Sequence, residues 1–214
     1  RNILKLSFFL FLMILWSCTP TQELATKTTQ SYDGLKADVE YLSSDELEGR
    51  ETGTPGEKKA AKYIKERFEK IGLVGVFEGN DPYYQHFKKT IRANPHSTEE
   101  KPNDKIVMGR NVGGYINNYA SHTIVIGAHY DHLGYGGQGS LHTGDPEIHN
   151  GADDNASGVA AMIRLAETLQ KHKLNSNILF IAFSGEEKGL WGSNFFVDNS
   201  PITVDDINYM INMD

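Results

Sequence analysis

The amino-acid sequence predicts an α/β fold in which a mixed, mostly parallel sheet is flanked by helices. Three short apolar runs point to this fold, and each ends at charged residues, in "HTIVIGAHYDH", "NILFIAFSGEE" and "YMINMD". Continuous apolar runs of about four to eight residues are typical of strands that are covered on both faces. Between the first two runs, "SGVAAMIRLAETLQKHK" repeats its apolar residues at helical spacing, which predicts a crossover helix.

One more helix is predicted ahead of these runs. In "EKKAAKYIKERFEKIGL", one helical face carries Ala60, Ile64, Phe68 and Ile71. Gly72 follows as a favourable C-terminal stop, because glycine readily adopts the backbone conformation with which many helices end. A short strand is predicted at residues 83–87, within a mostly polar stretch.

The first 18 residues are predicted to be a signal peptide of the lipoprotein type. Two cationic residues precede an apolar run over residues 6–16, which is shorter than the roughly 20 residues of a membrane-spanning helix. Cys18 follows in "LWSC", which resembles the box at which bacterial lipoproteins are lipidated. Because it is the only cysteine, a disulfide framework within the chain is excluded. We therefore expect export, either to the bacterial cell envelope as a lipid-anchored protein or to the periplasm or beyond.

Residues 19–31 are polar and threonine-rich and are predicted to form a tether, so that the folded domain covers residues 32–214. The formal net charge of the chain is −7, which argues against nucleic acid as a partner, because nucleic acid selects a basic face. Membrane contact is expected only through the N-terminal lipid anchor.

Charged residues follow the three apolar runs at positions that the fold would bring together. In open α/β sheets, ligands bind outside the carboxyl ends of the strands. The residues delivered to that edge are His129, Asp131, Glu186, Glu187 and Asp214. A further stretch, "NGADDNASGV", places Asp153 and Asp154 at the start of the crossover helix. The sequence thus predicts a site in which an imidazole is surrounded by several carboxylates.

These residue types fit a divalent metal centre. Zinc takes imidazole and carboxylate ligands, and catalytic zinc sites leave one position open. So many carboxylates would repel one another. Two dications about 3.5–4 Å apart that share one carboxylate would offset this repulsion. Asp131 lies two residues after His129 and could orient its ring. Of the neighbours Glu186 and Glu187, one would bind metal while the other faces water as a general base.

Five blocks of the chain, in this order, resemble a known family: "YLSSDELEGRETGTPGEKKAAKYI", "GAHYDHLG", "NGADDNASGV", "SGEEKGLWGS" and "INMD". The family is that of the secreted di-zinc aminopeptidases of the bacterial leucyl aminopeptidase type, with glutamate carboxypeptidase II and glutaminyl cyclase as relatives. The resemblance extends from about Leu35 to Asp214 and implies the phosphorylase/hydrolase-like fold of the zinc exopeptidases. It also implies a metal-dependent exopeptidase, foremost an aminopeptidase that hydrolyses N-terminal residues from peptides, with two Zn²⁺ per full-length chain.

The resemblance implies a role for each candidate residue. The metal ligands would be His129 for one zinc, Asp153 as the bridge between both, Glu187 for the second zinc and Asp214 for the first. Glu186 would be the general base, and Asp131 the orienting partner of His129. A cis peptide bond would follow the bridging aspartate, for which Asp153 is preferred to Asp154. The family's last ligand, a histidine, lies downstream of Asp214, so the 214-residue piece alone is expected to be inactive.

Three further histidines, His132, His142 and His149, are assigned to the surface or the substrate rim rather than to metal binding. Arg50 and the "SSDELEGRETGTPG" stretch are expected near the site, without a defined role. Three other functions remain open: a carboxypeptidase or dipeptidase on the same scaffold, a glutaminyl cyclase that uses one zinc without hydrolysis, and a binding module that has lost its metal. The last predicts substituted ligands, whereas every readable ligand is present.

Overall fold

The computed structural model describes residues 33–93, 101–137 and 139–214. The chain divides into two units, Arg1–Gly34 and Leu35–Asp214, of which the second contains the sheet and its helices. The predicted signal peptide (residues 1–18) and tether (residues 19–31) lie outside the described residues, so both stay predictions. Within the described residues, no helix combines the length and the apolar character needed to span a membrane.

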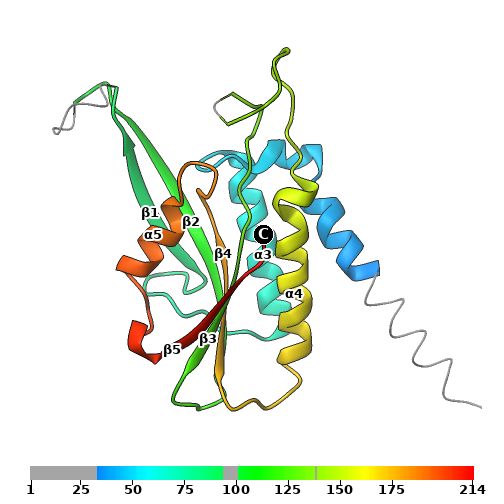
Figure 1. The fold of residues 1–214 in the computed structure, drawn as a ribbon, viewed down its shortest axis with the longest axis vertical. Coiled ribbons are helices and arrows are strands. Elements are labelled where there is room, and N and C mark those ends of the chain that lie inside the picture. Colours follow the sequence, from blue (N-terminus) through cyan, green and yellow to red (C-terminus); the bar gives the residue numbers. More distant parts are fainter. Residues whose placement is uncertain (1–32, 94–100, 138) are drawn as a thin grey trace, which may run out of the picture. The chain divides into compact units, whose positions relative to one another are not determined.

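A five-stranded mixed sheet forms the centre of the second unit (Figure 1). Its strands are β1 (Tyr84–Ile91), β2 (Lys105–Ile116), β3 (Thr123–His129), β4 (Asn177–Phe183) and β5 (Ile207–Asn212), in the spatial order β1-β2-β4-β3-β5. β2 pairs with β1 and β4 in antiparallel register, whereas β3 pairs in parallel with β4 and β5. The predicted α/β fold with a mixed sheet is confirmed, and its parallel part consists of the three strands that end at the candidate site.

Helices cover both faces of the sheet (Figure 1). The described helical segments are a helix that ends at residue 42, η2 (Asp45–Arg50), α3 (Pro55–Ile71), η3 (Ala152–Ser157), α4 (Gly158–Leu169), α5 (Trp191–Asp198) and η4 (Val204–Asp206). Residues of α3 and α4 share one apolar core with Phe180 of β4. The neighbouring Leu179 and Ile181 pack into a second core with Phe196 of α5. Successive residues of a strand point to opposite faces, so β4 is apolar throughout because both faces are covered.

The predicted helix over residues 57–71 is confirmed as part of α3. The Thr54 hydroxyl accepts a hydrogen bond from the Glu57 amide at 3.3 Å, and Pro55 occupies the first turn. Gly72 follows the helix in the left-handed conformation, with φ 91°, and donates to carbonyls of the last turn. The local sequence therefore determines both ends of this helix.

β2 is absent from the sequence-based prediction, because glycines interrupt its apolar pattern. At Gly109, an added Cβ would lie 2.3 Å from the ring of Phe87, and at Gly113 it would lie 2.6 Å from the ring of Phe77. These glycines leave room for aromatic rings that lie across the strand. Because β2 needs glycines at these positions, its sequence lacks the regular alternation of apolar and polar residues that indicates a strand.

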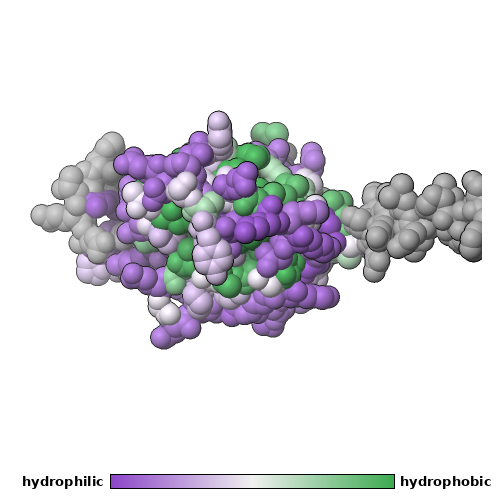
Figure 2. Space-filling model, turned by 90° about the horizontal axis from the view of Figure 1, so that it is seen from below, coloured by the Kyte–Doolittle hydropathy of each residue, from purple (hydrophilic) through white to green (hydrophobic). Residues whose placement is uncertain are grey.

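The face seen from below in Figure 2 lies at the end where the parallel strands begin, and hydrophobic residues are visible there among hydrophilic ones. The edge strand β5 contributes apolar side chains to the surface, with Tyr209 exposed by 70%, Met210 by 52% and Ile211 by 50%. The candidate site lies at the other end of these strands.

Candidate metal centre

The parallel strands bring their C-terminal residues to one edge of the sheet. β3 ends at His129, Glu186 and Glu187 follow the end of β4, and Asp214 follows the end of β5. Nε2 of His129 lies 3.3 Å from Oδ1 of Asp214, although 85 positions separate them in the sequence. The predicted meeting of strand ends is therefore observed.

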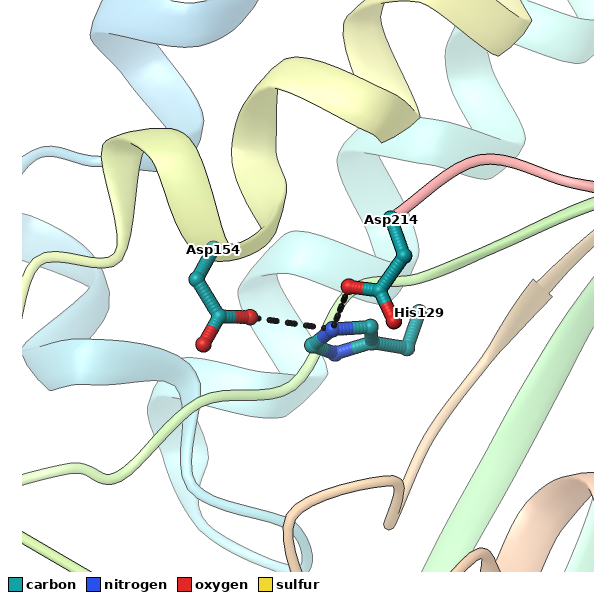
Figure 3. Close-up of side chains that lie close together, drawn as sticks. All are labelled: His129, Asp154 and Asp214. Atoms are coloured by element: carbon teal, nitrogen blue, oxygen red, sulfur yellow. Dashed lines mark hydrogen bonds and ion pairs between the residues drawn. The ribbon is translucent and has the colours of Figure 1, made fainter.

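Asp154 points toward this pair (Figure 3). Its Oδ1 lies 3.0 Å from His129 Nε2, and one potential ligand atom from each of the three residues lies within 4.8 Å of the others. The backbone of Asp154 is non-helical, with φ −108° and ψ 97°, which turns it out of the helical course of η3. Asp153 stays in the turn with an exposed side chain, and its carbonyl accepts a hydrogen bond from the Ser157 hydroxyl at 2.8 Å.

The structure places the carboxylate of Asp154, and not that of the expected Asp153, beside His129. The cis peptide bond is displaced by the same single residue, since it joins Asp154 to Asn155 instead of following Asp153. The Asn155 side-chain amide donates to the carbonyl of Met213 at 2.8 Å, which ties η3 to the segment that carries Asp214. The backbone thus selects which of two adjacent carboxylates faces the strand ends.

A second group of potential ligands lies beside the first and shares Asp154. It consists of His132, Asp154 and Glu187, whose ligand atoms also lie within 4.8 Å of one another. His132 Nδ1 lies 2.6 Å from Glu187 Oε1 and 4.0 Å from Asp154 Oδ2. Only 11% of the His132 side chain is exposed, so the expected rim position is corrected to one inside the centre.

His142 and His149 lie outside both of these groups. His142 is exposed and His149 is half-buried. His149 Nε2 lies 2.6 Å from the Ser140 hydroxyl, within the loop that follows β3. Among the residues that the structure describes, neither histidine belongs to a group of potential metal ligands.

Asp131 is fully buried and connects three segments of the centre. Its Oδ1 accepts a hydrogen bond from the Glu186 amide, and its Oδ2 accepts one from the Thr52 hydroxyl, both at 3.1 Å. The same Oδ1 lies 3.7 Å from Nδ1 of His129, whereas the backbone carbonyl oxygen of Asp131 lies nearer, at 3.2 Å. Asp131 can therefore orient the imidazole mainly through its carbonyl, while its carboxylate holds the backbone of Glu186.

The acids of the centre destabilise one another's ionised forms. Burial raises the pKa of Glu186, and the negative charges of Asp131, Glu187 and Asp214 raise it further. Burial also raises the pKa of Glu187, to which the charges of Asp154 and Asp131 add. A cation bound among these groups would relieve both effects.

In His129, by contrast, the neighbouring acids stabilise the charged form. Burial alone lowers the pKa of His129, but the hydrogen bond and charge of Asp131, together with the charges of Asp154 and Glu186, outweigh burial and raise the pKa to about 9. The protonated imidazole is then the cation nearest to these acids. Its position and the nitrogen and oxygen donors around it fit a divalent metal such as zinc in place of the proton.

A cavity of about 540 Å³ lies beside Glu187. Ile106, Val107 and Trp191 contribute apolar surface to its wall, and Lys188 contributes a charge. The ammonium group of Lys188 lies 3.0 Å from a carboxylate oxygen of Glu51. Since Glu187 belongs to both the cavity wall and the second ligand group, a molecule in the cavity would lie next to the candidate metal centre.

Comparisons with known proteins found one matching family model and several similar proteins. Residues 111–214 match the sequence model of Peptidase family M28. The alkaline phosphatase isozyme conversion protein of Escherichia coli (strain K12) is 30% identical over 151 residues, which are 68% of this chain and 40% of that protein. Aminopeptidase YwaD of Bacillus subtilis (strain 168) is 45% identical over 49 residues, which are 23% of this chain and 11% of that protein.

A solved structure shares the fold. A Zn-dependent exopeptidase from Parabacteroides distasonis superposes with a TM-score of 0.64 and 19% identity, over 84% of this chain and 60% of that chain. An identity this low supports similarity of fold only. The chain spans 40% of the length of the Escherichia coli relative and 60% of the exopeptidase chain.

Proposed function

Since this chain belongs to Peptidase family M28, a family of zinc metallopeptidases, we propose that the whole protein is an aminopeptidase that removes N-terminal residues from peptides at a two-zinc centre. The observation that carries the proposal is the position of Asp154, whose carboxylate lies 3.0 Å from His129 and 4.0 Å from His132. The similarity to an aminopeptidase of Bacillus subtilis supports the choice among exopeptidases.

Two zinc ions fit the two groups that share Asp154. His129, Asp154 and Asp214 hold one ion in this proposal, and Asp154 and Glu187 hold the other, with His132 beside it. The family resemblance implies one further histidine ligand for this second ion. Bound zinc polarises a scissile carbonyl and makes water a stronger acid.

Glu186 acts as the general base in this proposal. It takes a proton from water and passes it to the leaving amine. Its backbone amide donates to Asp131 at 3.1 Å, which holds the residue at the edge of the ligand groups without using its carboxylate. The pKa of Glu186 is raised, first by burial and then by neighbouring acids, and a raised pKa improves a base that works near neutral pH.

The charge of the centre favours a substrate with a free amino group. Five carboxylates, those of Asp131, Asp154, Glu186, Glu187 and Asp214, converge there, and their charge would exceed that of two bound dications, so a substrate ammonium group would still be attracted. The cavity beside Glu187 offers room for a peptide next to the metal ligands. An N-terminal residue is therefore the substrate end that this site suits best.

Hydrolysis by the full-length protein tests the proposal. Aminoacyl-p-nitroanilides should be hydrolysed, a zinc chelator should abolish the hydrolysis, and added zinc should restore it. The N-acetylated forms of the same substrates are the matched control and should not be cleaved, because they lack the free amine. Release of C-terminal residues would instead indicate a carboxypeptidase, and cyclisation of N-terminal glutamine a glutaminyl cyclase. Hydrolysis that resists the chelator would contradict a zinc mechanism.

Zinc binding is expected to release a proton from His129. With a pKa of about 9 in the metal-free protein, this imidazole is protonated at neutral pH, whereas a histidine that binds metal must be neutral. The proton on His129 should therefore weaken the apparent zinc affinity about tenfold for each pH unit below its pKa. Calorimetric titration with zinc in buffers of different ionisation enthalpy measures the release. Binding without net proton release near neutral pH would contradict this prediction.

A further inference from the structure

Arg50 is the largest fully buried side chain of the described residues, with 1% of its surface exposed. Among the described residues, its guanidinium group donates only to backbone carbonyls. Nε donates to Tyr130 at 2.7 Å, and Nη2 donates to Gly151 at 2.9 Å. Nη1 donates to Asn150 at 2.7 Å and also to Leu42. One side chain thus connects three segments that are far apart in the sequence.

Two of these segments carry the candidate ligands. Tyr130 lies between His129 and Asp131, and Asn150 and Gly151 lead into η3, where Asp154 is located. The distance between the end of β3 and the start of η3 sets the distance between His129 and Asp154. Because the guanidinium group is planar and rigid, its bonds to both segments fix this spacing geometrically.

The backbone of η2 strengthens the same connection. The His132 amide donates to the Arg50 carbonyl at 3.3 Å, and the Gly134 amide donates to the Gly49 carbonyl at 3.0 Å. Gly49 has a φ of 67°, and an added Cβ would lie 2.4 Å from the Gly134 carbonyl oxygen. η2 is therefore pressed against the loop that carries His132, with no room for a side chain between them.

Any stabilisation by Arg50 depends on the positions of the segments that it connects. Within the described part of the chain, Arg50 has no ion pair, and burial lowers its pKa to about 10, against the opposing effects of Asp131, Asp154 and Glu187. It therefore stays charged at neutral pH while fully removed from water. Taking a cation out of water costs several kcal/mol even after relaxation, and the bonds to four backbone carbonyls, which an apolar side chain could not make, offset this cost only while the connected segments keep their positions.

We propose that Arg50 is a positioning residue that holds the end of β3 and the start of η3 at the spacing that zinc requires, before the metal binds. The contacts of Arg50 are observed in the structure and do not depend on the proposed function. Only the identification of the metal as zinc rests on the proposed function. Zinc then meets His129 and Asp154 already in place, so little binding free energy is lost in ordering the two loops.

Zinc affinity of the full-length protein, measured by competition with a chromophoric chelator, tests the proposal without any substrate. Arg50→Lys keeps the charge but cannot bridge the same carbonyls, and Arg50→Met removes the charge. Both variants are expected to bind zinc about 10–100-fold more weakly, the usual effect of losing a partner that supports metal ligands. Arg164→Lys is the matched control. Arg164 is a mostly buried arginine that pairs with Asp38 at 3.0 Å and Glu167 at 2.5 Å, far from the ligand-bearing loops.

The three variants separate positioning from other roles. A purely structural role lowers the melting temperature of all three and leaves the zinc affinity of the folded protein unchanged. A purely electrostatic role makes Arg50→Met bind zinc more tightly, because a repelling cation is gone. Either result would overturn the proposal, whereas weaker binding in both Arg50 variants and wild-type affinity in Arg164→Lys would support it.

Hydrogen exchange of the wild-type protein provides a test that needs no variant to fold. In the zinc-free protein, the amides of His132, Gly134 and His149 should already be protected, because their bonds form without metal. If these amides exchange freely until zinc is added, Arg50 does not position the loops and the inference fails. If the wild-type protein binds no zinc at all, the proposed function fails, while this measurement still decides whether the loops are held in advance.

Discussion

Asp154→Asn is expected to remove nearly all peptidase activity and to deplete the protein of zinc. The two carboxylate oxygens of Asp154 face His129 at 3.0 Å and His132 at 4.0 Å, so a single side chain serves both ligand groups. Loss of a partner that merely supports a ligand costs about 10–100-fold in metal affinity or activity. Loss of a shared ligand should therefore lower kcat/KM by more than about 100-fold. Initial rates with an aminoacyl-p-nitroanilide and elemental analysis of the purified variant measure both effects.

Asp153→Asn is the matched control, because it makes the same chemical change one residue away. Asp153 is exposed and belongs to neither group of potential ligands in the described structure. This variant should keep wild-type kcat/KM and zinc content. If Asp153→Asn loses zinc and Asp154→Asn keeps it, Asp153 is the bridging ligand and the proposed role of Asp154 is wrong.

Glu186→Gln should lower kcat by about 10²–10⁴-fold, the usual contribution of a positioned general base. Glutamine keeps the shape of the side chain but cannot accept the proton from water. Zinc content should stay at the wild-type level, because Glu186 belongs to neither of the ligand groups found among the described residues. The expected signature is thus a zinc-loaded protein that binds substrate with little change in affinity but turns it over slowly.

Glu187→Gln is the variant of the neighbouring residue with which Glu186→Gln is compared. Glu187 lies 2.6 Å from His132 and belongs to the second ligand group. Its replacement should reduce zinc content as well as activity. Zinc loss in Glu186→Gln together with retention in Glu187→Gln would show that the two residues exchange the proposed roles.

Two of the three parallel strands, β3 and β4, could be predicted because they are covered on both faces, whereas β5 is an exposed edge strand. The runs inside β3 and β4 are apolar up to the polar or charged residues that follow, whereas the run of β5 is interrupted by Asn208 and Asn212. β2 could not be predicted in this way. Gly109 and Gly113 make room for the rings of Phe87 and Phe77, so glycines stand where apolar residues would indicate a strand. Tertiary packing, which no local pattern expresses, decides that these glycines belong to a strand.

The meeting of His129, Asp214 and the two glutamates also follows from the sequence, because parallel strands end at one edge. The choice between Asp153 and Asp154 does not follow in the same way. It depends on backbone angles at Asp154, with φ −108° and ψ 97°, that no composition rule specifies. The family resemblance indicated the segment, while the carboxylate beside His129 and the cis peptide bond lie one residue further along than expected.

The sequence did not indicate a role in the site for His132 or Arg50, and the reason is related. His132 lies in the loop beyond β3, where the alternation of a strand no longer indicates direction, although its spacing of three from His129 was a usable signal. Arg50 acts on the carbonyls of Tyr130 and Gly151, which are 80 and 101 positions away. Backbone carbonyls are the same in every residue, so such partners leave no trace in the sequence.

The most direct test of the two-metal centre is a zinc-loaded crystal of the full-length protein, with anomalous scattering recorded at the zinc edge. Two peaks about 3.5–4 Å apart should appear at the carboxyl ends of β3, β4 and β5, with Asp154 between them. His129 and Asp214 should lie about 2.0–2.2 Å from one peak, and Glu187 at a similar distance from the other. Peaks located elsewhere, or a pair bridged by a residue other than Asp154, would contradict the assignment.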